Sequence, residues 1–226
     1  MAEQMPSIEE VVPEQVAGLD LPLGHRVHLV GRGRTFVREV PGPRPDAPTV
    51  VLLHGWVASG GLNWFRCFEP LSEQFRVVDR DLRGHGRGMR SRRRFRLADC
   101  ADAIFCGYSM GGPVAQLMWR RHPDLVSGLV LAATSFSFVP ALQQRLAFAG
   151  AMAAMAGTTR TTQALTRLPG PVRSVLPRGL RGTERPSSMQ VWAAQEMRRH
   201  DVRMVLEAGN AGAAVSARRW IGGGRG

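Results

Sequence analysis

The pentapeptide at 107–111, Gly-Tyr-Ser-Met-Gly, carries the clearest chemistry in this sequence. It follows a short apolar stretch, Ala103–Cys106, and precedes a segment, 109–122, whose apolar residues recur at helical spacing. Glycines on both sides of a serine permit a sharp turn in which a Cβ would clash with the neighbouring backbone. A serine on such a turn, at the N-terminus of a helix, is placed to attack a carbonyl. We therefore expect Ser109 to be a nucleophile rather than an ordinary helix N-cap.

A second motif, His54-Gly55-Trp56, directly follows the apolar run Thr49–Leu53. A glycine there lets the backbone turn over the edge of a sheet, so that the Trp56 N–H faces the same anion as the Met110 N–H. Two such donors form an oxyanion hole, which stabilises the negative charge that develops during acyl transfer. His54 itself is expected to be structural.

These motifs need a parallel sheet to bring them together. Continuous apolar runs are typical of strands buried in such a sheet, and alternating segments that flank Gly31-Arg-Gly33 predict a β-hairpin. The expected strands are His25–Val30 and Arg34–Val40 in the hairpin, then Thr49–Leu53, Phe75–Asp79, Ala103–Cys106 and Leu125–Ala132; the expected helices are 60–73 and 109–122. This order predicts an α/β fold, a parallel-type sheet with flanking helices.

After Ala133 the sequence becomes rich in Ala, Arg, Met and Gln. We expect helices at Val139–Ala156 and Ser188–Leu206, separated by prolines. The domain organisation predicted is a core over 1–134, a helical lid-like insert over 135–205 and a return to the core over 206–226.

Three motifs in this order resemble the α/β-hydrolase superfamily, particularly its bacterial esterases, lipases and C–C hydrolases: Leu53-His-Gly-Trp56, Asp81-Leu-Arg-Gly-His-Gly86 and Gly107-Tyr-Ser-Met-Gly-Gly112. The resemblance implies that Ser109 is the nucleophile on the family's nucleophile elbow. It also implies that Trp56 and Met110 supply the oxyanion donors, and that no cofactor or metal takes part.

The sequence departs from the family in two places. The segment between Asp81 and Ala103 is short for a surface loop followed by a full crossover helix. The family also orders its triad as Ser, then Asp, then His, with the last two on loops after the lid. This chain ends shortly after Arg219-Trp-Ile-Gly222, so the acid and the base, with their two strands, are expected to be missing, as in a truncated enzyme.

Two histidines follow Ser109 in the sequence. His122 lies thirteen residues further along the expected helix, which is about 20 Å away and out of reach. His200 lies in the lid-like insert, with Glu196 one helical turn earlier and able to orient it. His200 could therefore belong to a Ser109–His200–Glu196 arrangement or face solvent, and we expect it to face solvent.

The leading hypothesis is a serine hydrolase that acts on ester-like acyl bonds of a small-molecule substrate through an acyl-enzyme, in an impaired form. The alternative is a binding-only pseudoenzyme or the non-enzymatic product of a disrupted gene. Esterases, thioesterases, perhydrolases and acyltransferases share these motifs, so the sequence leaves the substrate open.

The amino-acid composition limits the binding partners and the cellular location to be expected. The net charge is +12, and all 30 basic residues are arginines spread along the chain, which predicts a basic surface rather than a nucleic-acid site. The three cysteines show no metal-ligand spacing and fit reduced thiols in a cytoplasmic protein. The acidic N-terminus lacks the features of a signal peptide, and no apolar run is long enough to span a membrane.

The missing strands would leave Leu125–Ala132 as an apolar, uncharged sheet edge, which predicts self-association. The shortened crossover would uncover one face of the sheet and expose the apolar side chains of Val77 and Ile104.

Overall fold

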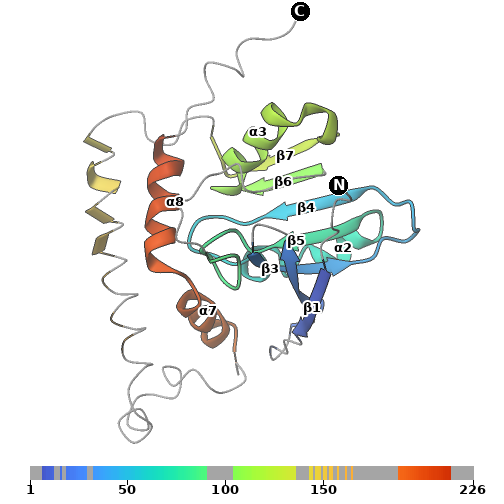
Figure 1. Ribbon diagram of the computed structural model, residues 1–226, viewed down its shortest axis with the longest axis horizontal. Helices are drawn as coiled ribbons and strands as arrows, with labels where there is room; N and C mark the ends of the chain where they lie inside the picture. Colours follow the sequence, from blue (N-terminus) through green and yellow to red (C-terminus); the bar gives the residue numbers. More distant parts are fainter. Residues whose placement is uncertain are drawn as a thin grey trace, which may run out of the picture.

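The computed structural model describes residues 7–12, 16, 19–29, 33–90, 104–135 and 188–214, together with isolated positions between 143 and 164. A mixed sheet with flanking helices forms the centre of this part of the chain (Figure 1). Seven strands lie in the order β1-β2-β3-β5-β4-β6-β7: β1 Ser7–Val12, β2 Gly24–Leu29, β3 Gly33–Val40, β4 Thr49–Leu53, β5 Arg76–Arg80, β6 Ile104–Tyr108 and β7 Leu129–Ala132. β4 to β7 run parallel to one another, whereas β1, β2 and β3 pair antiparallel and β3 joins β5 antiparallel.

The α/β fold expected from the sequence is confirmed, including the hairpin, which is β2 and β3. The three strands expected at 49–53, 75–79 and 103–106 are confirmed as β4, β5 and β6, with ends that differ by at most two residues. β1 was not expected. It pairs with β2 along the outer edge of the hairpin.

The strand expected over 125–132 was too long. Its first residue, Leu125, is the last of a 3-10 turn, Pro123–Leu125, and only Leu129–Ala132 pairs with β6. Pro123 fixes φ and has no N–H to donate to a sheet, so it favours the turn. Within the described residues β7 pairs with β6 alone and is an edge of the sheet.

The helices whose two ends fall within the described residues are α1 Gly60–Trp64, α2 Phe68–Ser72, α3 Gly111–Arg121, α7 Met189–Arg198 and α8 Val202–Ala214. The single helix expected over 60–73 is therefore wrong, since α1 and α2 are separated by a turn. A continuous helix would need an N–H at Pro70 to donate to the Arg66 carbonyl, and proline has none.

The helix expected over Ser188–Leu206 is two helices, α7 and α8, broken at 199–201. Asp201 starts the second helix, because its Oδ1 accepts a hydrogen bond from the Met204 N–H at 3.0 Å, as a capping residue does. The boundary placed between residues 205 and 206 falls inside α8. The helix expected at Val139–Ala156 lies largely outside the described residues, although the described positions between 143 and 164 are helical.

Apolar clusters pack on both faces of the sheet. On one face Val50, Leu52 and Val77 lie against Trp64 and Phe68 of the short helices and Trp192 of α7; on the other, Val51, Leu53 and Phe105 lie against Val114 and Met118 of α3. The expected exposure of Val77 is wrong, because its side chain is fully buried by α1, α2 and α7. Ile104 is partly buried against the same cluster. The connection at 91–103, from which that exposure was inferred, lies outside the described residues.

Candidate active site

Ser109 occupies the sharp turn between β6 and α3. Its φ is +50°, in the left-handed region that L-residues with a side chain rarely adopt. The turn is possible because its neighbours are glycines. A Cβ on Gly107 would lie 2.4 Å from the Gly111 carbonyl oxygen, and one on Gly111 would lie 2.2 Å from the Leu53 carbonyl oxygen. The position expected for Ser109 is thus observed, and its catalytic role stays a prediction.

The backbone of Ser109 is held by the chain that follows β7. The Ser109 N–H donates to the Ala132 carbonyl at 3.0 Å, and the Thr134 hydroxyl donates to the Ser109 carbonyl at 2.8 Å. The Gly112 N–H donates to the same Ser109 carbonyl at 3.0 Å. Strained backbone persists only where its surroundings specify it. Thr134 therefore has a positioning role that the sequence did not reveal, since a lone threonine after a strand carries no motif.

The loop after β4 lies beside Ser109. We call Gly55, Trp56 and Val57 the oxyanion loop. The parallel pairing of β4 with β6 sets Leu53 opposite Gly107, so both strands end at the same edge of the sheet. A Cβ on Gly55 would lie 3.3 Å from the Ser109 Cβ, which is closer than most side chains tolerate. Only glycine therefore fits between β4 and the serine without displacing a neighbour.

Two features fix the conformation of the oxyanion loop. The Gly55 N–H donates to the Asn63 Oδ1 at 2.7 Å, which ties the loop to α1. Val57 has a φ of +53°, a strained conformation for a β-branched residue. Asn63 is a second positioning residue that no motif in the sequence indicated.

Helix α8 covers the two residues expected to donate to an oxyanion. The Trp56 indole Nε1 donates to the Val205 carbonyl at 2.8 Å, and Ala208 and Ala211 of α8 belong to the apolar cluster that contains Met110 and Trp56. Met110 is buried. The structure thus brings Trp56 and Met110 to one corner of the fold. Their amides as oxyanion donors stay a prediction.

His54 is structural, as expected. It is fully buried, its Nε2 accepts the Leu82 N–H at 2.8 Å, and its Nδ1 bonds to the Gly55 carbonyl at 2.7 Å. Burial lowers the pKa of His54, against the opposing charge of Asp81. The neutral imidazole therefore joins the loops after β4 and β5, and both of its nitrogens are used.

His200 is neither solvent-facing nor arranged as a catalytic base. It is only 4% exposed, and its Nδ1 accepts the Gly86 N–H at 2.7 Å. A neutral ring that accepts at Nδ1 carries its proton on Nε2, whereas a base that receives a proton on Nε2 needs that atom unprotonated. Burial lowers the pKa of His200 to about 4. The carboxylate of Glu196 pairs with Arg199 and Arg87.

The structure describes all six histidines of the chain, and the remaining four are His85, His122, His25 and His28. His85 is buried between His54 and His200, with ring centroids 5.3 Å from each. His122 ends α3 and is exposed, so it is about 20 Å along the helix from the serine. His25 and His28 lie on β2, four strands from β6, which is roughly 19 Å at about 4.8 Å per strand.

Two buried aspartates belong to the scaffold. Asp81 accepts the Gly60 N–H on Oδ1 and the Arg87 N–H on Oδ2, each at 2.8 Å, and so joins α1 to the loop after β5. Burial raises the pKa of Asp79 well above its ordinary value, and the nearby Asp81 raises it further. Both oxygens of Asp81 are thus engaged in holding loops, which leaves it unsuited to orient a base.

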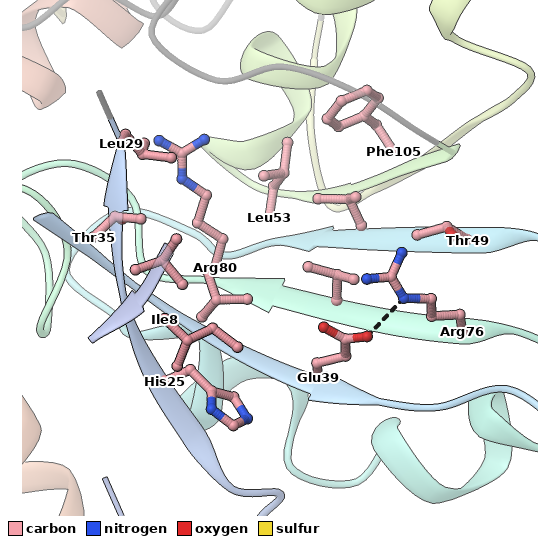
Figure 2. Close-up of a pocket in the computed structure, with 14 residues that line it drawn as sticks. Ile8, His25, Leu29, Thr35, Glu39, Thr49, Leu53, Arg76, Arg80 and Phe105 are labelled. Carbon is pink, nitrogen blue, oxygen red and sulfur yellow. Dashed lines mark hydrogen bonds and ion pairs between the residues drawn. The ribbon is translucent and has the colours of Figure 1, made fainter. Parts of the chain in front are cut away.

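A hollow of about 460 Å³ lies on the face of the sheet that also carries α3 (Figure 2). It is lined by apolar side chains such as Val51, Val78 and Phe105, with Arg80 reaching across it and an Arg76–Glu39 ion pair at its edge. Ser109, Trp56 and Met110 are not among the residues that line this hollow. Among the described residues, no cluster of His, Cys, Asp or Glu could hold a metal ion, and no helix is long and apolar enough to cross a membrane.

Several known proteins are similar to this chain in sequence or in fold. The chain is 40% identical over 103 residues to the pimeloyl-(acyl-carrier protein) methyl ester esterase of Chromobacterium violaceum, and 36% identical over 115 residues to that of Vibrio atlanticus. These matches cover 42% and 47% of this chain, and 40% and 43% of the esterases, so the chain matches less than half the length of these relatives.

Solved structures extend the likeness of the fold. A hydrolase from Pseudomonas aeruginosa superposes with a TM-score of 0.61 at 18% identity, covering 92% of this chain and 77% of its own. An esterase from Exiguobacterium antarcticum superposes with a TM-score of 0.58 at 16% identity, covering 86% and 75%. The family model of the alpha/beta hydrolase fold matches residues 48–179, more than half of the chain. The chain is therefore a member of the α/β-hydrolase family.

Proposed function

We propose that the protein is a serine hydrolase of small acyl esters in which Ser109 is the nucleophile. The observation that carries the proposal is the φ of +50° at Ser109, on a turn between β6 and α3 that Thr134 and the glycines around it maintain. Such a turn has no evident structural purpose other than to present the serine side chain. The similarity to methyl ester esterases supports an ester substrate.

In the reaction we propose, the Ser109 hydroxyl adds to the ester carbonyl. The oxygen of the resulting tetrahedral intermediate accepts hydrogen bonds from the Trp56 and Met110 amides, the alcohol leaves, and water then hydrolyses the acyl-enzyme. Each proton transfer needs a base near Ser109. Because each histidine of the chain is either hydrogen-bonded within the scaffold or distant from Ser109, we propose that the chain by itself turns over slowly.

The test is covalent labelling of the purified chain with a fluorophosphonate, followed by mass spectrometry of the peptide that contains Ser109. We expect slow but site-specific labelling of Ser109, absent in Ser109→Ala. Hydrolysis of p-nitrophenyl esters should be about 10³-fold or more slower than by the Chromobacterium violaceum esterase. Labelling spread over other serines, or none above Ser109→Ala, would refute the proposal. Rapid turnover would refute the impairment alone.

A binding role without turnover is the second candidate, and the placement of the histidines favours it. It predicts that an ester or its acid binds the chain with an affinity that Ser109→Ala leaves unchanged. Equilibrium binding, measured beside the labelling rate, separates the two candidates.

We propose also that the edge strand β7 supports self-association. Val130 and Leu131 are 53% and 42% exposed, and Trp119 of the adjacent helix α3 is 42% exposed. An apolar, uncharged edge of this kind pairs readily with another strand.

A further inference from the structure

The oxyanion loop is under strain, so something must hold it. Val57 is a β-branched residue at a φ of +53°, a strained conformation that persists only where its surroundings enforce it. Asn63 fixes the first residue of the loop through the Gly55 N–H. That bond leaves the second half of the loop, Trp56 and Val57, to be fixed from another side.

That other side is the corner between α7 and α8. The Trp56 indole donates to the Val205 carbonyl of α8, and the Val57 carbonyl lies close enough to the His200 imidazole to raise its pKa. His200 is one residue before Asp201, at the break between the two helices. The corner thus meets the loop at two consecutive residues.

His200 is itself fixed by the loop that follows β5. Its Nδ1 accepts the Gly86 N–H at 2.7 Å, and its neighbour Asp201 donates its backbone N–H to the Gly84 carbonyl at 2.8 Å. Arg90 donates to the Arg199 carbonyl and to the Gly86 carbonyl. The imidazole is therefore held by the loop after β5 and lies beside the Val57 carbonyl of the oxyanion loop after β4.

We propose that His200 is a positioning residue that holds the oxyanion loop in its productive conformation from the α7–α8 corner. The proposal rests on the proposed function, because a productive conformation is defined by the attack of Ser109. His200 touches neither the serine nor the substrate. It acts through the backbone of Val57 and Gly86, and its removal should loosen the loop without moving Ser109.

The link works only while the imidazole is neutral. A proton on Nδ1 would face the Gly86 N–H, donor against donor, and break that bond. The groups around the ring oppose protonation on balance: burial, His54 and Arg90 lower the pKa of His200, while Asp81 and the Val57 carbonyl raise it, to a result of about 4. His85, whose ring lies 5.3 Å away, is also neutral, because burial lowers its pKa well below the ordinary value.

Two variants of the full chain test the link. His200→Leu removes the acceptor for the Gly86 N–H, whereas His200→Asn keeps an acceptor oxygen near the Nδ1 position and cannot titrate in this range. His122→Asn, on an exposed histidine at the end of α3, is the matched control. The readouts are hydrogen exchange of the peptide that covers 54–58, the rate of Ser109 labelling, and the free energy of unfolding.

At pH 7 we expect His200→Leu to exchange the 54–58 amides about tenfold faster and to label Ser109 about tenfold more slowly, as for loss of one buried hydrogen bond. His200→Asn should stay within about threefold of the wild type, and His122→Asn should match it. On acidification the labelling rate of wild type relative to His200→Asn should fall between pH 6.5 and 4. Taking this ratio removes the pH dependence that both proteins share.

A folded His200→Leu with wild-type exchange at 54–58 overturns the proposal. If His200→Leu does not fold, the pH ratio decides, and a ratio that stays flat from pH 7 to 4 overturns it. Absence of Ser109 labelling in the wild type at every pH refutes the proposed function instead, and the exchange data then judge the link by itself.

Discussion

Replacing Thr134 with valine should slow the acylation of Ser109 more than it destabilises the fold as a whole. The hydroxyl of Thr134 donates to the Ser109 carbonyl at 2.8 Å, and valine has the same shape without the donor. A net hydrogen bond contributes about 1 kcal/mol, and a carbonyl that loses its partner in a partly buried site costs about 1–3 kcal/mol. The Gly112 N–H still reaches the same carbonyl, which places the loss near the lower end, roughly 1–2 kcal/mol.

The size of the effect on the labelling rate depends on which part of the structure the hydrogen bond stabilises. If the bond mainly holds the left-handed conformation of Ser109, its loss shifts the serine out of position, and about 1.4 kcal/mol corresponds to a tenfold slower reaction. The assay is the rate of fluorophosphonate labelling at Ser109, measured beside urea unfolding. We expect a five- to thirtyfold slower rate and a loss of stability of about 1 kcal/mol.

Two controls make the result specific. Thr134→Ser keeps the hydroxyl and should label at close to the wild-type rate. Thr161→Val removes a hydroxyl that also donates to a backbone carbonyl, that of Gly157 at 2.9 Å, but in an exposed helical position. It should change neither measurement. A Thr134→Val protein that labels at the wild-type rate would show that the strain at Ser109 is maintained without this bond, and the reasoning would be wrong.

Four further outcomes are expected. Added imidazole should accelerate ester hydrolysis by the wild type but not by Ser109→Ala, because the serine lacks a base. Equal acceleration of the two proteins would contradict this prediction. Acid should destabilise the protein: burial lowers the pKa values of His54 and His85 below 6.5, so the stability that the neutral rings contribute is complete above about pH 6.5 and is lost as the pH falls, which urea titrations from pH 7 to 4 will follow. Gly107→Ala should lose several kcal/mol or fail to fold, since its Cβ would lie 2.4 Å from a backbone oxygen, and a stable variant would contradict the tight turn. Val130→Lys on the β7 edge should reduce light scattering at equal concentration, and unchanged scattering would place self-association elsewhere.

The part of the fold that the sequence predicted is the part specified by short-range pattern. Continuous apolar runs indicated β4, β5 and β6, and the glycines around Ser109 indicated the turn, because each signal lies within a few residues of the structure that it specifies. The motifs then came together because parallel strands end at one edge of a sheet. The two helix breaks could have been predicted from single residues. Pro70 lacks a backbone donor, and Asp201 is of a type that caps helices.

The rest depended on partners distant in sequence. Val77 was expected on an exposed face, yet Trp192 packs over the same cluster from more than a hundred residues further along the chain. The solvent-facing position expected for His200 failed for the same reason, because the acceptor role of its ring is fixed by Gly86. Neither contact produces a periodic pattern in the amino-acid sequence. A buried polar residue that links two loops looks like a surface residue until the loops are placed.

The geometry around Ser109 and the transfer of its proton are therefore separate properties of this chain. The strained turn is held by two hydrogen-bonding groups beside it in the sheet, the Thr134 hydroxyl and the Ala132 carbonyl. Gly55, which has no side chain, leaves room for Ser109. None of these ionises, so the nucleophile keeps its position across the pH range in which the fold survives. Proton transfer, in contrast, needs an imidazole or carboxylate that approaches from outside this group, and each histidine of the chain is engaged or distant. A base supplied from solution meets a serine that is already positioned, so its effect on rate should appear at once on mixing and without any change in the unfolding transition.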